Sequence, residues 1–311
     1  MTVLGRTLNL TASKPRIGFI GLGAMGRGMA RNLAAKGFPL TVVGHRNRAP
    51  VDDLKSRGAA EAKTPAEAAE KSDVVIICVT ETPVVEQIVY GADGVLKAAR
   101  KDLILIDCTT SEPVSTDRII ADCKAKGVRF ADAPLARSPK EAEEGRLNAM
   151  VGADADVFAV IEPVLKAFCE NIFHVGGPGS GHKTKLVYNF LTMGQAALIS
   201  EALVAAAKSG LDLDAFCKVV SAGGANSGIF QMIAPSALAG TYDGLKFGLD
   251  LARKDLRYYT HLTEHLGLPG YLGETVHQSF VLASALGYGG QFVGSMVAAQ
   301  EKITGTAIAR R

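Results

Sequence analysis

The sequence predicts an α/β fold in two parts: a doubly wound, mainly parallel sheet over residues 16–177 and an all-helical part over residues 178–311. Short apolar runs rich in β-branched residues alternate with helical patterns as far as about residue 176, which is typical of parallel strands with helices on both faces. A glycine-rich turn follows the first of these runs. After a second glycine-rich stretch at residues 176–181 clear strand patterns disappear, so the remainder is expected to be helical.

The composition is that of a soluble globular protein. The chain has 311 residues, 48% of them hydrophobic and 21% charged, which is enough for two domains with substantial cores. The formal net charge is only +3 and lysines and arginines form no run, so nucleic acid is not an expected partner. The five cysteines are widely separated and odd in number, which favours reduced thiols in a cytoplasmic protein.

The sequence predicts neither a secretory signal nor a membrane span. Residues 1–15 lack a continuous apolar stretch ending at a small-residue cleavage site, so they are expected to form an N-terminal extension and not a secretory signal. The apolar stretch 186–207 contains Asn189, Gln195 and Glu201, which would be costly in lipid. We therefore expect a buried helix of a soluble protein there, and no membrane partner.

The elements of the first part are predicted from apolar runs and from helix start and stop signals. Thr64, Pro65 and Glu67 combine an N-cap, a proline at the first helical position and a capping-box glutamate, so a helix starts there. Strands are predicted at residues 16–20, 40–43, 73–79, 103–107, 128–132, 148–151 and 172–175. The other helices are predicted after residue 25 up to Gly37, and at residues 51–57, 83–90, 113–126 and 154–169.

The second part is divided into helices by turns that carry glycine or proline. These helices are predicted at residues 182–208, 212–221, 228–239, 248–266, 271–285 and 290–303. The first is too long and too apolar to lie on a surface. Helical domains built around such a helix often expose apolar faces that a second subunit covers, so a homodimer or homotetramer is expected.

The turn after the first strand predicts a dinucleotide site. Gly21, Gly23 and Gly26 fit the G-x-G-x-x-G spacing, with Ala24 and Met25 between the last two glycines. Gly21 permits the sharp turn, Gly23 lets the backbone approach a pyrophosphate, and Gly26 allows close packing of the helix on the strand. The phosphates would meet the positive end of the helix dipole. The first part is therefore predicted to be a Rossmann-type domain, in which Val79 at the end of the run 73–79 also contacts the cofactor.

The loop after the second strand predicts which nicotinamide cofactor binds. NAD-binding domains carry an acidic residue at the end of this strand, and none is present. The loop instead contains His45, Arg46 and Arg48, and arginines suit the 2′-phosphate of NADP. NADP is therefore expected, with NAD possible. The alternative is a solvated basic loop without a role in binding.

A lysine and an asparagine follow the second glycine-rich stretch. Lys185 and Asn189 are four residues apart, which places both on one face of a helix. A lysine whose pKa is lowered by burial can exchange a proton with an oxygen that undergoes hydride transfer. The alternative is a solvated helix lysine. His182 lies three residues earlier and either lines the same pocket or lies on the surface.

Four motifs in order make the chain resemble the β-hydroxyacid dehydrogenases, whose best-known members are the 3-hydroxyisobutyrate dehydrogenases. The motifs are GFIGLGAMGRGMA near the start, DAPLARSPKEAEEGRL at residues 132–147, GSGHKTKLVYN at residues 179–189 and LARKDL at residues 251–256. The resemblance implies nicotinamide-dependent interconversion of a short hydroxyacid and its aldehyde or ketone. It also implies a helical C-terminal domain that joins subunits.

The resemblance assigns roles to five residues. Lys185 falls on the family's catalytic lysine, and Asn189 falls on its substrate-binding asparagine. Lys254 and Asp255 match the family's KD pair, with Lys254 near the cofactor and Asp255 near the substrate. Thr110 matches the threonine beside the nicotinamide. No metal is implied, and His261 and His265, four residues apart, lack a third ligand.

Two of the motifs depart from the family, one of them substantially. Most members carry Ser-Gly-Gly for the substrate carboxylate, whereas this chain has Ala136, Arg137 and Ser138, and Tyr188 replaces an asparagine. The sequence at Ala136–Ser138 resembles the Gly-Arg-Thr arrangement of sulfolactaldehyde reductases, in which an arginine binds a sulfonate. Arg137 and Ser138 are therefore expected to bind a small anionic carbonyl or hydroxy substrate. Two other functions stay open: an imine reductase, whose relatives usually lack the lysine, and a nucleotide-sensing homologue without catalysis.

Overall fold

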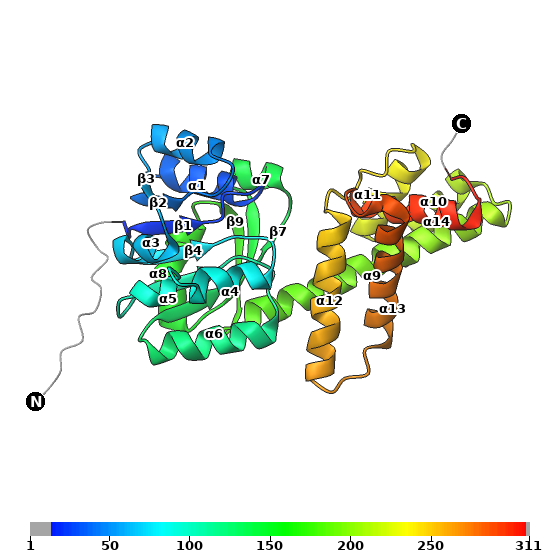
Figure 1. Cartoon of the computed structure of the whole chain (residues 1–311). Helices are drawn as coiled ribbons and strands as arrows, with labels where there is room; N and C mark the ends of the chain where they lie inside the picture. The colour runs from blue at the N-terminus through cyan, green and yellow to red at the C-terminus, as the bar shows by residue number, and fades with distance from the viewer. Residues whose placement is uncertain (1–13, 309–311) are drawn as a thin grey trace, which may run out of the picture. The chain divides into compact units, whose positions relative to one another are not determined.

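The structure is a computed structural model that describes residues 14–308. Its contacts divide the chain into two compact units, Met1–Thr184 and Lys185–Arg311, whose elements are labelled in Figure 1. The sequence-based boundary lies a few residues earlier, at 177–178. Of the predicted N-terminal extension, residues 1–13 lie outside the described residues.

A nine-stranded sheet forms the centre of the described part of the first unit. The strand order is β3-β2-β1-β4-β5-β6-β8-β7, with β9 paired to β8. The pairs within β1 to β6 and the β8–β9 pair are parallel, whereas β8 is antiparallel to β6 and β7. The strands are β1 (Ile17–Ile20), β2 (Leu40–Val43), β3 (Ala60–Ala62), β4 (Val74–Ile77), β5 (Ile104–Asp107), β6 (Arg129–Asp132), β7 (Leu135–Ala136), β8 (Leu147–Gly152) and β9 (Cys169–Gly176). The predicted doubly wound, mainly parallel sheet is confirmed.

Helices cover both faces of this sheet (Figure 1). They are α1 (Gly26–Ala35), α2 (Ala49–Ser56), α3 (Pro65–Lys71), α4 (Thr82–Tyr90), α5 (Val95–Ala98), α6 (Pro113–Ala125), α7 (Pro139–Glu144) and α8 (Ala155–Leu165). The start of α3 is as predicted, because the Thr64 hydroxyl accepts a hydrogen bond from the Glu67 N–H at 3.1 Å. The Glu67 carboxylate accepts from the Lys63 N–H instead of the cap residue itself.

Strand side chains alternate between two hydrophobic cores. Phe19 and Ile76 pack with residues of α1, α2 and α8 on one face. Ile20 and Ile77 pack with residues of α4, α5 and α6 on the other face. Central strands buried on both faces explain why their sequence reads as continuous β-branched runs without alternation.

Some elements of the first unit differ from prediction. The predicted helix at 154–169 ends at Leu165, and the chain enters β9 at Cys169. The apolar pattern continues through this turn because Ala167, Phe168 and Cys169 are also buried, so hydrophobicity alone could not mark the end of the helix. Strands β3 and β7 were not predicted, since three and two residues are too few for a recognisable pattern.

The second unit is helical throughout its described part, as predicted. Its helices are α9 (Ser180–Lys208, which begins in the first unit), α10 (Leu213–Ala222), α11 (Gly228–Leu238), α12 (Leu249–His265), α13 (Tyr271–Ala283) and α14 (Met296–Thr304). A π-helical turn, Ser284–Tyr288, and a 3-10 turn, Val293–Ser295, connect the last two. The core lies where α9, α11, α12, α13 and α14 meet, around Phe230, Leu256 and Phe280.

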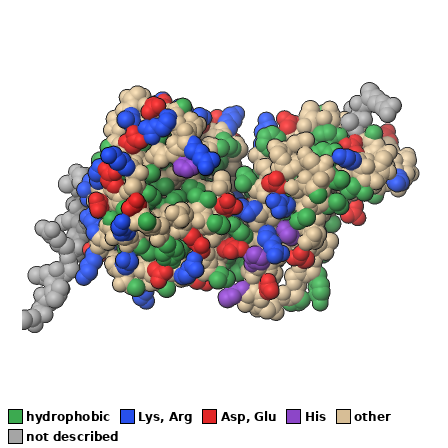
Figure 2. Space-filling view, in the orientation of Figure 1, with side chains coloured by type: hydrophobic (Ala, Val, Ile, Leu, Met, Phe, Trp, Pro, Cys, Tyr) green, Lys and Arg blue, Asp and Glu red, His purple; other side chains and the backbone are tan. Residues whose placement is uncertain are grey.

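The expectation that α9 is buried along its length is wrong. One face packs into the core through Met193, Ala196 and Leu203. Of the most apolar stretch of 18 residues in this helix, however, only 33% is buried. Leu191 and Leu198 are 57% and 70% exposed, and Figure 2 shows hydrophobic side chains on the visible surface of this unit. Within the described residues α9 alone is long and apolar enough to cross a membrane, a test that core helices of soluble proteins also pass.

Candidate active site

The glycine turn has the geometry that its three glycines predict. Gly21 has a φ of +103°, and a Cβ there would lie 2.1 Å from the carbonyl oxygen of Cys78. A Cβ on Gly26 would lie 1.9 Å from the Gly21 carbonyl oxygen and also press on the Phe19 ring. By contrast, a Cβ on Gly23 would meet no atom within 4 Å. The first and third glycines are therefore required by the fold, whereas the second leaves open space where a pyrophosphate is expected.

This turn lies where the strand order reverses. β1 is flanked by β2 on one side and β4 on the other, so the carboxyl ends of β1 and β4 form the topological switch point where such sheets bind ligands. Gly21 and Ala24 follow β1 and open α1, with Met25 at the N-cap position. Val79 follows β4, half-buried, and its N–H donates to the Thr109 hydroxyl at 3.2 Å. The predicted cofactor residues of the turn and Val79 thus lie at the same edge of the sheet.

The basic loop after β2 is exposed. His45 and Arg46 are exposed, and Arg46 forms no ion pair within residues 14–308. Arg48 is engaged: its two Nη atoms lie 2.7 Å and 3.0 Å from the two carboxylate oxygens of Glu61. The ion pair holds the pKa of Glu61 well below its usual value, at about 2. Of the two arginines, Arg46 is the one available for a phosphate, and Arg48 would first have to leave Glu61.

The predicted catalytic residues of the second unit form a buried cluster. Asn189 Nδ2 donates to Asp255 Oδ2 at 2.6 Å, and Lys254 Nζ lies 2.9 Å from Asp255 Oδ1. Lys185 lies one helical turn before Asn189 and is 8% exposed, with its Nζ 5.6 Å from the centre of the Tyr188 ring. The structure therefore brings together Lys185, Asn189, Lys254 and Asp255, which lie on α9 and α12.

The electrostatics of this cluster favour proton transfer by Lys185. Burial lowers the pKa of Lys185 from 10.5 to about 8, and the nearby Lys254 lowers it further, while the Asp255 carboxylate opposes the shift. A lysine with a pKa near 8 exchanges protons at physiological pH, which an ordinary surface lysine does not. A perturbed pKa in a cluster of polar groups marks a candidate functional site.

Arg137 and Ser138 lie between β7 and α7. Arg137 has a φ of +81°, a left-handed conformation that is uncommon for a residue with a side chain. Its guanidinium donates to the Glu170 carboxylate and to the carbonyl oxygen of Arg146. Ser138 caps α7 in a capping box with Glu141. The ion pair with Glu170 is a partner that the sequence did not suggest, and an anionic substrate would have to compete with it.

Sequence reasoning missed a set of buried polar residues in the first unit. Asp107 and Asp132 are the last residues of the neighbouring strands β5 and β6, and they face each other in register. His182 is 0% exposed, so the surface position considered for this residue is wrong. Thr109 is buried beside Thr110, the predicted nicotinamide-side residue. The sequence did contain one indication of this buried set, because each of two consecutive predicted strands ends in an aspartate.

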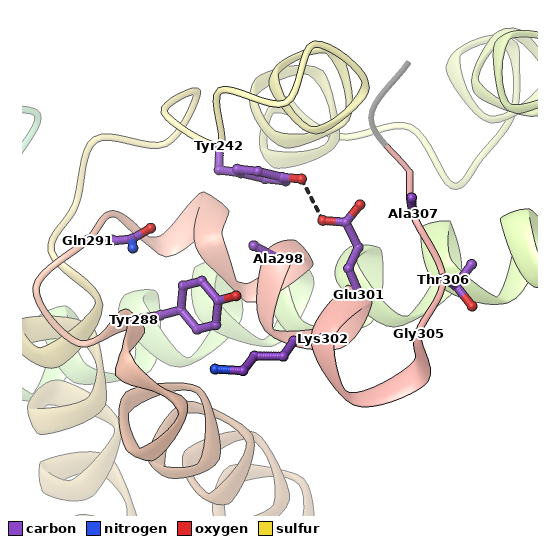
Figure 3. A pocket seen from close by; sticks show the side chains of 9 residues that line it. All are labelled: Tyr242, Tyr288, Gln291, Ala298, Glu301, Lys302, Gly305, Thr306 and Ala307. Atoms are coloured by element: carbon purple, nitrogen blue, oxygen red, sulfur yellow. Dashed lines mark hydrogen bonds between the residues drawn. The ribbon is translucent and has the colours of Figure 1, made fainter. Parts of the chain in front are cut away.

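A hollow of the second unit lies apart from the predicted site residues. A cavity of about 530 Å³ lies beside α14 and is bordered by Tyr242, Tyr288, Glu301 and Lys302 (Figure 3). Tyr242 Oη donates to Glu301 Oε2 at 2.5 Å across this cavity, and the second carboxylate oxygen accepts from the Ile308 N–H. None of the predicted site residues borders it, and its carboxylate is already paired.

A parallel sheet with a glycine turn at its switch point, followed by a helical unit with a buried lysine, defines the class of nicotinamide-dependent oxidoreductases. Two family models match the chain. The NAD binding domain of 6-phosphogluconate dehydrogenase matches residues 16–176, and the NAD-binding domain of NADP-dependent 3-hydroxyisobutyrate dehydrogenase matches residues 179–299.

Individual proteins agree with these models. The chain is 34% identical to 3-sulfolactaldehyde reductase of Escherichia coli (strain K12) over 88% of this chain and 92% of the relative. It is 34% identical to 2-hydroxy-3-oxopropionate reductase of the same organism over 81% of this chain and 86% of the relative. The structure of 3-hydroxyisobutyrate dehydrogenase from Mycobacterium tuberculosis with L-serine has the same fold, with a TM-score of 0.85 at 24% identity over 93% of this chain and 99% of that one.

The chain belongs to the β-hydroxyacid dehydrogenase family of NAD(P)-dependent dehydrogenases and reductases. The resemblance inferred from the four sequence motifs is thereby confirmed, and the protein is an oxidoreductase with a nicotinamide cofactor.

Proposed function

We propose that the protein is an NADP-dependent reductase that converts a small anionic aldehyde or ketone to the corresponding 3-hydroxy acid or hydroxysulfonate, and the reverse. The observation that carries the proposal is the buried Lys185, whose pKa is lowered to about 8 beside the hydrogen-bonded pair of Asn189 and Asp255. Such a lysine is suited to acid and base catalysis at an oxygen.

The residues of the first unit fit the cofactor. Gly23 leaves the backbone uncovered, and the N–H groups at the start of α1 offer hydrogen bonds and a positive dipole to a pyrophosphate. Arg46 supplies a positive charge for a 2′-phosphate. No residue directly after β2 is acidic, and the Glu61 carboxylate that lies beside Gly44 is paired with Arg48. When bound, the nicotinamide supplies or accepts the hydride.

Lys185 moves the proton. In the reducing direction its ammonium donates a proton to the carbonyl oxygen as negative charge develops there, and the neutral amine remains. In the oxidising direction the neutral amine takes the hydroxyl proton. Asn189 is held by Asp255 Oδ2, so its side-chain oxygen is free to accept from a substrate hydroxyl. Asp255 also keeps a negative charge near Lys185, which limits the fall of the lysine pKa.

Arg137 is proposed to bind the anionic end of the substrate. A guanidinium presents a planar set of donors that grips a carboxylate or sulfonate in two places. The left-handed conformation of Arg137 costs about 1 kcal/mol or more, and strain of this kind is concentrated at functional sites. The relative named 3-sulfolactaldehyde reductase supports an anionic substrate, since its named substrate carries a sulfonate.

We further propose that the protein works as a homodimer or homotetramer. The exposed apolar face of α9, which includes Val187, Leu191 and Leu198, is the kind of surface that a second subunit covers. Light scattering of the purified protein at two concentrations tests this part, and a monomer at both would contradict it.

The experiment for the activity is a panel of three aldehydes of similar length that carry a sulfonate, a carboxylate or no charge. The loss of NADPH absorbance is followed with the wild type, with Lys185→Ala and with Lys183→Ala. Lys183 is the matched control, because it lies on the same helix but is exposed and paired with Asp117. We expect turnover of the anionic aldehydes by the wild type and by Lys183→Ala only. Turnover of none of the aldehydes, or equal turnover by Lys185→Ala, would contradict the proposal.

A further inference from the structure

A buried polar cluster lies at the carboxyl ends of β5 and β6, outside the residues assigned to catalysis above. It consists of Asp107, Thr116, Asp132 and His182, each at most 1% exposed. Buried charges of this kind are costly unless they are paired and hydrogen-bonded. The cluster lies next to the edge of the sheet where ligands are expected. Its hydrogen bonds show which segments it holds in place.

Asp132 fixes the first turn of α9. Its Oδ1 accepts from the Gly179 N–H and its Oδ2 from the His182 N–H, both at 2.6 Å. The backbone at Gly181 lies so close to β6 and β8 that a Cβ there would stand 2.5 Å from the Met150 carbonyl oxygen and 2.7 Å from that of Asp132. The start of α9 is therefore tied to the ends of two strands by hydrogen bonds and by close backbone approach.

The His182 side chain adds a further contact between the first turn of α9 and the rest of the first unit. Its Nδ1 lies 2.7 Å from Thr116 Oγ1, and the Thr116 hydroxyl donates its proton to the Glu112 carbonyl oxygen at 3.0 Å. Thr116 Oγ1 therefore accepts, which places a proton on Nδ1. Nε2 lies 3.7 Å from Asp107 Oδ2 and has no hydrogen-bond partner among the described residues. Nδ1 is also 3.8 Å from Asp132 Oδ2, so carboxylates flank the ring on two sides.

Asp107 extends the cluster to the predicted nicotinamide side. Its Oδ1 accepts from the Thr109 N–H and its Oδ2 from the Ser111 hydroxyl, both at 2.8 Å. These contacts fix the residues on either side of Thr110, which the family resemblance places beside the nicotinamide. The same carboxylate thus faces His182 and orders the loop that carries Thr110.

We propose that His182 is a positioning residue that, with Asp132, Thr116 and Asp107, locks the first turn of α9 to the loop of Thr110 and thereby sets where Lys185 stands three residues further along the helix. The proposal rests on the proposed role of Lys185 as acid and base. It assigns no chemical step to His182, whose side chain is fully buried.

The energetics favour orientation over stability as the function of this cluster. Apolar side chains of similar volume in place of the whole cluster would fill the site without the cost of desolvating an imidazole and two carboxylates, and such replacements are often neutral or stabilising. A displacement of about 1 Å at a catalytic group, by contrast, can lower turnover about a hundredfold. The polar contacts fix the first turn of α9 against the ends of β5 and β6, which packing alone would fix less sharply.

The test compares His182→Leu, which keeps volume and removes polarity, with His182→Asn, whose amide replaces the ring Nδ1 beside Thr116. We expect His182→Leu to lower kcat at least about tenfold, with the KM for the aldehyde and the Kd for NADPH changed less than about threefold. His182→Asn should recover most of the lost kcat. Thr116→Val, which removes the same hydrogen bond from the other side, should lower kcat in the same direction and serves where His182→Leu does not fold.

A structural readout separates this proposal from the proposed function. Crystal structures of the wild type and His182→Leu should show Lys185 displaced relative to Thr110 by about 1 Å, with the Asn189–Asp255 contact retained. An unmoved Lys185, an unchanged kcat in His182→Leu, or equal loss in His182→Asn and His182→Leu would each overturn the positioning role. A wild type that reduces no aldehyde would overturn the proposed function instead, while the crystallographic comparison still decides whether His182 orients the helix.

Discussion

The cluster around Lys185 and the basic loop after β2 are both predicted to meet charged groups, but one is buried and the other is exposed. Lys185, Asn189 and Asp255 are 8%, 3% and 2% exposed, and Asn189 donates a hydrogen bond to Asp255. His45 and Arg46 are exposed on the loop between β2 and α2. The first region is held by contacts within the protein, whereas the second is open to solvent.

Substitutions in the buried cluster should therefore have larger effects on function than substitutions in the exposed loop. Charges in a buried site act through a low local dielectric and their geometry is already set, so their loss should damage turnover. Charges on an exposed loop are screened by water and salt, so their loss should change cofactor preference by a smaller factor.

Replacing Lys185 with alanine should have the largest effect. We expect kcat to fall about a hundredfold or more, because the proton donor is needed as charge develops on the substrate oxygen, while NADPH binding is unchanged. Steady-state kinetics and a fluorescence titration with NADPH measure the two quantities. A near-normal kcat in Lys185→Ala would exclude this residue as the acid and base.

Replacing Arg46 should have the next largest effect. The wild type should prefer NADPH to NADH, and Arg46→Ala should reduce that preference about ten- to a hundredfold, because a charge-assisted contact to the 2′-phosphate is lost. Arg48→Ala is the matched comparison within the loop, and a smaller change is expected because Arg48 is already paired with Glu61. Comparable kcat/KM for the two cofactors in the wild type would contradict the assignment of this loop.

Arg137 and Glu170 should give smaller effects that depend on the substrate. Arg137→Ala should raise the KM for anionic aldehydes about tenfold and leave uncharged aldehydes nearly unaffected, because only an anion uses the guanidinium. Glu170→Gln should lower the KM for the same anionic aldehydes about two- to fivefold, since the competing partner of Arg137 loses its charge. An equal change for charged and uncharged aldehydes in either variant would remove Arg137 from the substrate site.

The sequence was sufficient for the fold because its local signals agree with the global arrangement. The buried runs around Ile76 and Ile106 are continuous because both faces of the sheet are covered, and Thr64 marks the start of α3 at the expected residue. The end of α8 was misplaced because Phe168 and Cys169 continue an apolar pattern after the helix has stopped. The hydrophobic pattern of a sequence shows which residues are buried. Residues at the end of α8 and at the start of β9 are both buried, so the pattern does not show where the helix ends and the strand begins.

The candidate site was predicted less completely, for a different reason. Lys185 and Asn189 share a helix, so their spacing alone indicated that they lie together. The partners of Arg48, Arg137 and His182 are remote in sequence: Glu61, Glu170 and Thr116 reach them only through the packing of separate elements. Ion pairs and buried hydrogen bonds of this kind follow from tertiary structure, and no local pattern of residues announces them.

The central claim is that a buried Lys185 with a lowered pKa exchanges the proton with the substrate oxygen. The most direct test is the pH dependence of kcat for the wild type in both directions of the reaction. Reduction needs the ammonium, so its kcat should be constant at low pH and fall as the pH rises through about 8, whereas oxidation needs the neutral amine and should rise through the same pH. Profiles that are flat across this range in both directions, or that move in the same direction, would contradict the account.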